Sequence, residues 1–218
     1  MTQTVGATAV TTTDGLPLLP PRAVVDGTHR RLLEVALVRF GARGFHGVSV
    51  REIADAAGIR ASSLYSHLAS KEQLLFQLML LGHEEHHASI RAALLGAGAG
   101  PSEQVVAVVG AHVAFHATYP LLGRVCNREI AALSDPSRAE VLAVRRQSEQ
   151  LFTDVIERGI ELGEFSVEDP WLAAAATLAP GLRLAEWWDA ALGYDVDSVA
   201  RAYGTFALRV LGADGADR

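Results

Sequence analysis

With 218 residues, half of them hydrophobic and a fifth charged, the chain can form one large domain or a small domain joined to a larger one, and its composition excludes wholesale disorder. Its single cysteine excludes a disulfide within the chain, and a Thr-rich opening without an apolar run predicts a cytoplasmic protein. The net charge of −6 is unevenly distributed, because residues 22–73 carry eight basic and five acidic side chains. A basic segment in an otherwise acidic chain is typical of a DNA-binding module joined to a second domain.

The opening of the chain predicts an arm followed by a helix. Residues 1–25 lack periodicity and end in a Pro-rich run, so we expect a flexible arm there. Thr28 can cap a first helix, whose apolar side chains recur at helical spacing as far as Phe40. Gly44 then supplies the left-handed stop that commonly ends a helix.

Two short helices with a tight turn between them come next. Ser49 and Glu52 have the spacing of a capping box, which indicates the start of the first. The second is expected from about residue 61 to 68. Two short helices joined by a three-residue turn that contains glycine predict a helix-turn-helix domain, which we place at residues 26–75.

The rest of the chain, residues 76–218, is expected to form a larger helical domain, so the predicted fold class is all-α. A capping box at Ser70 starts a long helix that reaches about residue 95. The longest uncharged span, 105–123, lacks basic flanks, and we interpret it as a buried helix and its exit rather than a membrane span. Further helices are expected at roughly 102–118, 121–133, 137–162, 170–192 and 196–211.

Residues 44–74 resemble the DNA-binding domain of TetR-family transcriptional repressors. The resemblance rests on Gly-Phe before the second helix, Ile-Ala and Ala-Gly-Ile around the turn, Leu-Tyr in the third helix, and Ser-Lys-Glu before a closing leucine. It implies a homodimer that binds a palindromic operator in double-stranded DNA and releases it when a small-molecule inducer binds. It also implies a pocket among the middle helices and a four-helix bundle formed between subunits by the last two long helices.

The expected DNA contacts lie at the start of the second helix, along the third, and just beyond it. Small residues there let the backbone approach the major groove, and the free amides at the second helix's N-terminus suit a phosphate. Arg60 stands where family members usually carry Ser or Thr, and we expect it to contact DNA. The candidate DNA-binding residues are Ser49, Arg51, Arg60, Ala61, Ser62, Ser63, Tyr65, Ser66, His67 and Lys71.

The middle helices suggest a bulky, largely apolar inducer. One helix carries more apolar side chains than a single buried face needs, and two arginines on the next could pair with a carboxylate or phosphate at the pocket mouth. Alternatively, Phe115 is core and both arginines pair with Glu129 or face solvent. The segments around 119–129, 151–165 and 187–188 are similar to TetR members that regulate fatty-acid, sterol or other acyl-CoA catabolism, which implies an acyl-CoA. The candidate ligand-binding residues are Phe115, Tyr119, Arg124, Arg128 and Trp187.

Two alternative sites stay open. His83 and His87 have the His-Glu-x-x-His spacing of zinc peptidases, and His112 and His116 repeat the i, i+4 spacing. They allow a metal-sensing regulator, or remotely a zinc hydrolase, against the simpler interpretation of a polar helix face. Cys126 lies between two arginines and could be a redox-sensing thiol or a small buried hydrophobic residue.

The sequence lacks the patterns that most enzyme classes require. It has no Gly-x-Ser-x-Gly elbow, no phosphate-cradling Gly-rich loop and no evident pair of catalytic carboxylates. We therefore expect neither an enzyme nor a cofactor, and no membrane partner.

Overall fold

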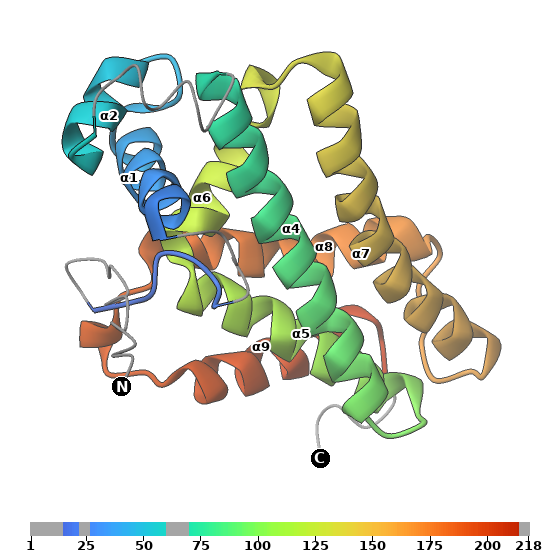
Figure 1. Ribbon diagram of the computed structural model, residues 1–218. Coiled ribbons are helices and arrows are strands. Elements are labelled where there is room, and N and C mark those ends of the chain that lie inside the picture. The colour runs from blue at the N-terminus through green and yellow to red at the C-terminus, as the bar shows by residue number, and fades with distance from the viewer. Residues whose placement is uncertain (1–14, 22–26, 60–69, 214–218) are drawn as a thin grey trace, which may run out of the picture.

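The computed structural model describes residues 15–21, 27–59 and 70–213 (Figure 1). Within these ranges the chain forms α-helices and two short 3-10 turns, and no strand, so the all-α prediction is confirmed. The helices are α1 (Gly27–Arg43), α2 (Val50–Ala57), α4 (Lys71–Gly96), α5 (Pro101–Thr118), α6 (Pro120–Arg128), α7 (Asp135–Glu161), α8 (Pro170–Trp187) and α9 (Val196–Val210), and the 3-10 turns are η1 (Ile130–Ala132) and η2 (Ala190–Leu192). The third helix of the expected helix-turn-helix domain lies outside the described residues.

Side-chain caps set where several helices begin. The predicted capping box of α2 is present, because the Ser49 hydroxyl accepts from the Glu52 N–H at 3.2 Å and the Glu52 carboxylate accepts from the Ser49 N–H at 2.8 Å. Ser70 caps α4 by accepting from the Gln73 N–H at 3.1 Å. Gly58 ends α2 at φ 73°, a left-handed conformation that only glycine adopts at little cost.

Two hydrophobic cores share the helix α4. Its first half contributes Leu74, Leu75 and Leu78 to a core built with α1, α2 and α6. Its second half contributes Ile90 to a core formed with α5, α7, α8 and α9. Figure 1 shows α4 as the long diagonal that connects the two groups of helices. The small N-terminal domain and the larger C-terminal domain are therefore joined by one continuous element.

The helix α5 lies at the centre of the C-terminal domain and packs against α4, α7, α8 and α9. No single helix among the described residues is long and apolar enough to cross a membrane. Only α5 and α6 taken together meet that criterion, and they are bent by 99° where they meet. The uncharged span is consistent with the buried helix and exit expected from the sequence.

Two predicted helices are shorter in the structure. The helix expected at 121–133 breaks at Glu129, whose backbone leaves the helical region (φ −101°, ψ 9°) while its carboxylate accepts from the Phe45 N–H at 3.1 Å. The helix expected at 170–192 ends at Trp187, because Trp188 is extended (φ −62°, ψ 127°). Asp189 then accepts from the Ala191 N–H at 2.8 Å and starts a separate 3-10 turn.

Part of the expected N-terminal arm packs onto the protein instead. Leu18 and Leu19 are each only 1% exposed and belong to the first core. Arg30 of α1 donates to the carbonyl oxygens of Leu19 and Pro20 at 3.2 Å each, which fixes the segment. The expectation of a flexible arm is therefore wrong for residues 15–21, because two leucines gain more from burial than the chain loses by ordering there.

Leu19→Ala is expected to lower the free energy of unfolding by about 2–4 kcal/mol, the usual cost of removing buried methyl groups and leaving a cavity. Leu95→Ala is the matched control, because Leu95 is 83% exposed at the end of α4 and its loss should change stability by less than about 0.5 kcal/mol. Urea unfolding followed by circular dichroism measures both. Equal effects of the two substitutions would contradict the packing of residues 15–21.

Candidate functional site

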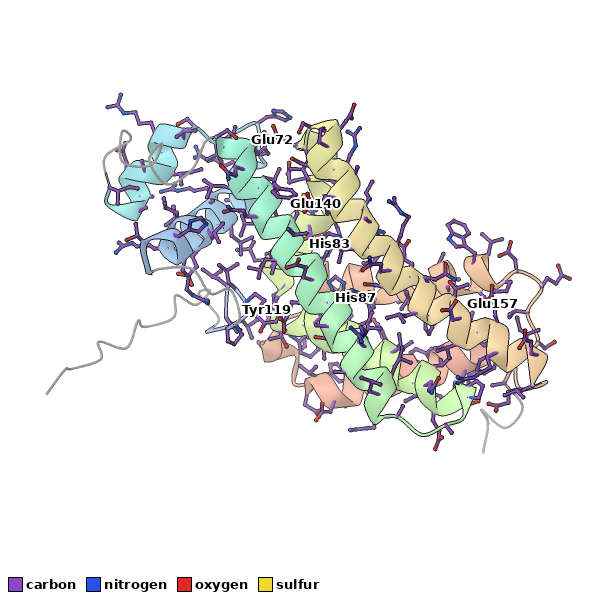
Figure 2. All side chains as sticks on the ribbon, turned by 45° about the vertical axis from the view of Figure 1, so that its right-hand side comes forward. Glu72, His83, His87, Tyr119, Glu140 and Glu157 are labelled. Carbon is purple, nitrogen blue, oxygen red and sulfur yellow. The ribbon has the colours of Figure 1, made fainter. Side chains whose placement is uncertain are left out.

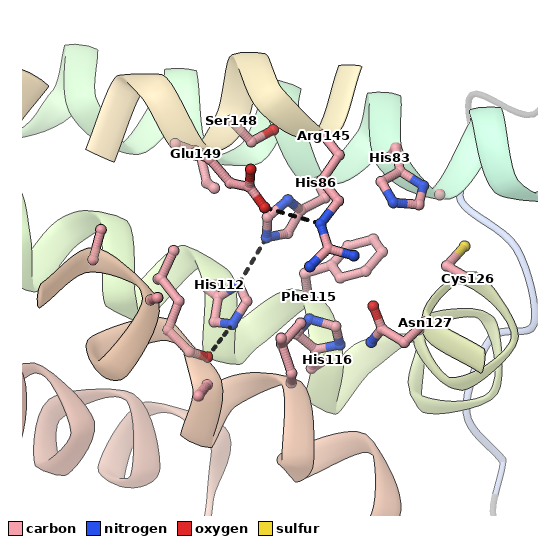
Figure 3. A pocket seen from close by; sticks show the side chains of 18 of the residues that line it. His83, His86, His112, Phe115, His116, Cys126, Asn127, Arg145, Ser148 and Glu149 are labelled. Atoms are coloured by element: carbon pink, nitrogen blue, oxygen red, sulfur yellow. Dashed lines mark hydrogen bonds and ion pairs between the residues drawn. The ribbon is translucent and has the colours of Figure 1, made fainter. Parts of the chain in front are cut away.

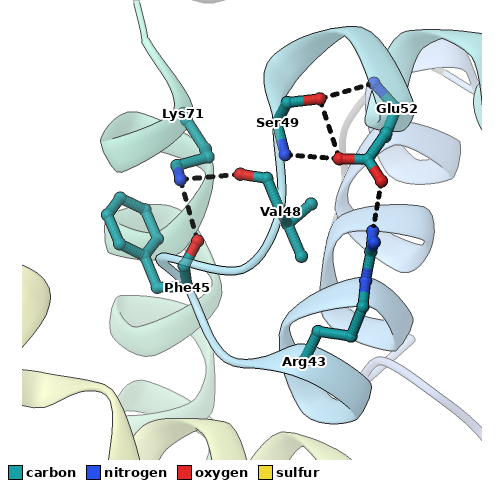
Figure 4. Close-up of polar contacts among 6 residues, drawn as sticks. All are labelled: Arg43, Phe45, Val48, Ser49, Glu52 and Lys71. Atoms are coloured by element: carbon teal, nitrogen blue, oxygen red, sulfur yellow. Dashed lines mark hydrogen bonds and ion pairs between the residues drawn. The ribbon is translucent and has the colours of Figure 1, made fainter.

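The loop between α1 and α2 is fastened to the start of α4 by Lys71 (Figure 4). Its ammonium donates to the carbonyl oxygens of Phe45 and Val48 at 2.8 and 2.7 Å, and lies 4.0 Å from the centroid of the Phe45 ring. Partial burial lowers the Lys71 pKa. Since an ammonium has three donors, one remains for another partner, and the predicted contact of Lys71 with a DNA phosphate stays a prediction.

The exposed edge of α2 carries the other described candidates for DNA contact. The Arg51 side chain is 86% exposed and only loosely paired with Asp55, at 3.8 Å, so it can reach a phosphate. Ser49 is engaged in the cap, where its N–H and hydroxyl bond the Glu52 carboxylate and, with Arg43, lower the pKa of Glu52 to about 2. The remaining candidates lie outside the described residues: Arg60, Ala61, Ser62, Ser63, Tyr65, Ser66 and His67.

A cavity of about 230 Å³ lies in the C-terminal domain (Figure 3). Five helices, α4 to α8, supply its walls, and most of the lining surface is apolar with polar groups gathered on α4, α5 and α7. The lining residues are Gly82, His83, His86, Ile90, His112, Phe115, His116, Gly123, Cys126, Asn127, Arg145, Ser148, Glu149, Thr153, Trp171, Ala174, Ala175, Leu178, Ala179 and Leu182. An enclosed, mainly apolar space with a few convergent polar groups is the usual form of a small-molecule site.

Of the predicted ligand-binding residues, only Phe115 lines this cavity. Arg128 pairs with Glu186 of α8 through both carboxylate oxygens, and not with Glu129. The other residues predicted with it, Tyr119, Arg124 and Trp187, are not among the lining residues. The structure thus places a different charged pair at the cavity.

That charged pair is Arg145 and Glu149 on α7, which sequence reasoning did not single out. Arg145 Nε donates to the Glu149 carboxylate at 2.9 Å, and the two side chains remain 36% and 42% exposed. An i, i+4 pair on a long amphipathic helix looks like an ordinary surface ion pair in the sequence. Its position facing a cavity becomes apparent only when α7 packs against α4.

The buried histidines form a directional hydrogen-bond chain. His112 Nε2 lies 3.0 Å from the Leu178 carbonyl, which can only accept, so this nitrogen carries the proton. His112 Nδ1 therefore accepts from His86 Nε2 at 2.8 Å. His116 is only 3% exposed, and its Nδ1 has no hydrogen-bond partner within the described part of the chain.

Glycines on two helices allow these rings to pack closely. A Cβ at Gly123 of α6 would lie 2.7 Å from His116 Nδ1, and one at Gly181 of α8 would lie 2.2 Å from His112 Cδ2. Both distances are shorter than van der Waals contact, so any larger residue would displace a ring. The rings of His112 and His116 are thus held at the cavity by direct packing against the backbones of α8 and α6.

Burial keeps the histidines neutral. Desolvation lowers the pKa of His112 to about 4 and lowers the pKa values of His86 and His116 well below 6.5. Neighbouring positive charge adds to this effect, since the Arg145 guanidinium disfavours protonation of His112 and His116. At neutral pH the cavity therefore presents uncharged imidazoles beside the Arg145–Glu149 ion pair.

The structure assembles a different histidine set from the one proposed for metal. The ligand nitrogens that lie within 4.8 Å of one another belong to His86, His112 and His116. His83 Nδ1 instead donates to the Met79 carbonyl at 2.8 Å, and His87 Nδ1 lies 3.2 Å from the Ser148 hydroxyl. The His-Glu-x-x-His spacing therefore places neither of its two histidines, His83 and His87, in the trio.

Cys126 is not a reactive thiol. It is 5% exposed, and burial raises its pKa to about 12, so the thiolate that a redox sensor needs is not formed at neutral pH. The alternative interpretation, a small buried hydrophobic residue, is confirmed.

Comparison with known proteins agrees with both domains. Residues 32–78 match the family "Bacterial regulatory proteins, tetR family", and residues 98–211 match "Tetracyclin repressor-like, C-terminal domain". The transcriptional repressor KstR2 of Mycobacterium tuberculosis is 30% identical over 142 residues, which cover 65% of this chain and 70% of that protein.

Solved structures agree as well. A tetR-family regulatory protein from Rhodococcus RHA1 has a TM-score of 0.81 at 29% identity, covering 87% of this chain and 99% of that one. AibR, solved with isovaleryl coenzyme A and operator DNA, has a TM-score of 0.74 at 23% identity, covering 82% of this chain and 97% of that one, and this likeness shows the fold alone.

The all-helical fold, the capped helix α2 and the family match over residues 32–78 define a helix-turn-helix transcriptional regulator of bacterial type. The chain belongs to the TetR family and is a transcriptional repressor of that family. The predicted family, fold class and general function are thereby confirmed. The family consists of regulators rather than enzymes, and the matches give no support to the metal-sensing alternative.

Lowering the pH from about 7 to about 5 is expected to reduce the free energy of unfolding. The folded pKa values of His86, His112 and His116 lie below 6.5, so the unfolded chain binds protons that the folded chain does not. Their contribution is complete above pH 6.5 and is lost as the pH falls, by up to about 1.4 kcal/mol per pH unit for each histidine. Urea unfolding across this pH range measures the slope.

His112→Gln should reduce that slope, because one of the three neutral imidazoles is gone. His46→Gln is the control, since His46 is exposed in the α1–α2 loop. If neither His112→Gln nor His46→Gln changes the pH slope of the free energy of unfolding, the cavity histidines do not control stability in acid.

Proposed function

We propose that the protein is a homodimer that binds a palindromic operator in the cytoplasm and leaves it when an acyl-CoA places its acyl group in the cavity. One observation carries the proposal: the helix that lines the cavity also contacts the DNA-binding module. Asn127 of α6 faces the cavity, and two residues later Glu129 accepts from the Phe45 N–H at 3.1 Å. A ligand that moves α6 therefore acts directly on the α1–α2 loop.

A second connection runs through α4. Its first residue, Lys71, holds the α1–α2 loop, and its middle carries His83 and His86 on the cavity. Figure 2 shows His83 and His87 along α4 between the two ends of the molecule. The ligand can shift the spacing of the two recognition helices only if it binds the DNA-incompetent arrangement more tightly than the competent one.

The size of the cavity favours an acyl group over a whole coenzyme. About 150 Å³ of apolar cavity accommodates a molecule of benzene size, so about 230 Å³ suits a short or branched acyl chain. Arg145 and Trp171 line the cavity and remain partly exposed, which indicates an opening between α7 and α8. The complex of AibR with isovaleryl coenzyme A supports this ligand class.

The dimer interface is proposed on the outer faces of α8 and α9. Phe206 and Val210, one turn apart on α9, are 52% and 50% exposed, and Leu172 and Trp187 of α8 are 57% and 45% exposed. Exposed apolar side chains concentrated on two packed helices indicate a surface that a partner covers. A second copy would complete a four-helix bundle, as the family resemblance implies.

Phe206→Asp is expected to give monomers in sedimentation equilibrium, because it places a charge in the proposed apolar interface. Operator affinity should fall on the order of a hundredfold or more, since each monomer can hold only one half-site. Leu95→Asp, on an exposed position at the end of α4 and outside the proposed interface, should stay dimeric and bind normally. A dimeric Phe206→Asp protein would place the interface elsewhere.

Acyl-CoA is expected to release the protein from a fluorescent palindromic operator, with operator affinity loosened on the order of a hundredfold, as seen by anisotropy. Leu182→Trp fills the cavity and should raise the acyl-CoA concentration needed at least tenfold while operator binding persists. Leu162→Trp, on a 64% exposed position at the end of α7, is the matched control. A complex indifferent to short, branched and long acyl-CoAs would refute the inducer class.

A further inference from the structure

Three polar groups at the cavity have bonding capacity that the protein does not use. Arg145 donates through Nε to Glu149, and its two terminal nitrogens have no hydrogen-bond partner within residues 15–21, 27–59 and 70–213. His116 Nδ1 is buried without a partner in the same ranges, and the Asn127 amide faces the cavity. Figure 3 shows Arg145 reaching from α7 toward His116, with Asn127 beside it on α6.

An unsatisfied buried nitrogen is costly, so such a group in a cavity indicates where a ligand atom sits. The guanidinium terminal nitrogens and the Asn127 amide are donors, and the ring of His116 can take either tautomer. Donors that converge from three helices call for an acceptor on the ligand. A carboxylate fits best, because a guanidinium can bind its two oxygens in parallel.

The charges around the cavity disfavour the competing interpretation of the histidines as a cation site. Arg145 opposes protonation of His112 and His116, and a metal ion would meet the same repulsion at greater charge. The lining residue with a negative charge is Glu149, and its carboxylate is paired with Nε of Arg145, which leaves the terminal nitrogens of the guanidinium for another acceptor. An anion, by contrast, gains from the guanidinium and meets neutral imidazoles.

We propose that the ligand carries a free carboxylate on the part that enters the cavity, and that Arg145 binds it with His116 and Asn127 as supporting contacts. This inference rests on the proposed function, which places the inducer in this cavity, and it specifies the inducer's chemistry. The ligand is then either a free carboxylic acid with an apolar body or an acyl-CoA whose acyl group bears a second, free carboxylate.

The first experiment compares matched ligands on the full-length protein. Isothermal titration with 3-cyclohexylpropanoate and with the corresponding amide should show the acid binding at least tenfold more tightly. Arg145→Gln should remove this preference. Arg146→Gln should keep it, because Arg146 is the next residue on α7 but faces solvent. Failure of the wild-type protein to prefer the acid would overturn the proposal.

A second substitution is expected to strengthen binding of the acid, a result that misfolding could not produce. Glu149→Gln frees Nε of Arg145 and removes the competing carboxylate, so the acid should bind several-fold more tightly than to wild type. A purely structural role of the pair would instead give weaker or unchanged binding, and that result would overturn the proposal.

Two further experiments test whether the carboxylate belongs to a CoA thioester and whether the histidines bind a metal instead. Glutaryl-CoA against valeryl-CoA compares thioesters with and without a free carboxylate, and operator release by glutaryl-CoA alone would identify the thioester form. Release by both, equally, would overturn the carboxylate while leaving the proposed function intact. One-to-one zinc binding to chelator-treated protein that His112→Ala abolishes would also overturn it.

Discussion

The structure depends on one helix that has to satisfy two cores at once. Residues Leu74, Leu75 and Leu78 of α4 are fully buried in the N-terminal core, and Ile90 is fully buried in the C-terminal one. Because both ends are packed, α4 cannot bend or rotate at one end without disturbing contacts at the other. The cavity histidines lie between these two anchored halves, at the position where a tilt of the helix would be felt in both domains.

The domains meet through apolar and polar contacts, because α1 and α6 share the first hydrophobic core and two hydrogen bonds lie beside it. Glu129 bonds the Phe45 N–H, and Glu72 accepts from the Ser134 N–H at 2.8 Å. Such bonds can be exchanged for water at a cost of about 1 kcal/mol each. A ligand that changes the spacing of the DNA-binding modules can exchange these polar bonds while the apolar packing of α1 against α6 is kept. It needs only a modest difference in affinity between the two arrangements.

Local signals predicted the start and the end of α2 well, because caps and left-handed glycines act within a few residues. Ser49, Glu52 and Gly58 have the structural roles expected of them. Helix ends that depend on distant partners were missed, as at Glu129, whose carboxylate turns toward a residue far away in sequence. The same limit explains why the cavity's charged pair was missed. Arg124 and Arg128 were predicted at the cavity instead, because their i, i+4 spacing shows that they share a helix face. The spacing does not show that Glu186 of α8 pairs with Arg128 on that face.

The histidine patterns show the same difference between spacing and surroundings. The i, i+4 spacing of His112 and His116 correctly indicated a shared face, yet the ring that joins them is His86, which lies inside the His-Glu-x-x-His pattern rather than at its ends. Which histidine turns inward is decided by the packing of α4 against α5 and α7, and this packing leaves no trace in the spacing.

The buried leucines near the N-terminus have a practical consequence for handling the protein. A shortened chain that begins beyond residue 21 would lose Leu18 and Leu19 and uncover the apolar surface that they occupy beside α1. The Arg30 guanidinium would lose its two carbonyl acceptors in the same region while keeping Glu34. Such a surface favours self-association and precipitation.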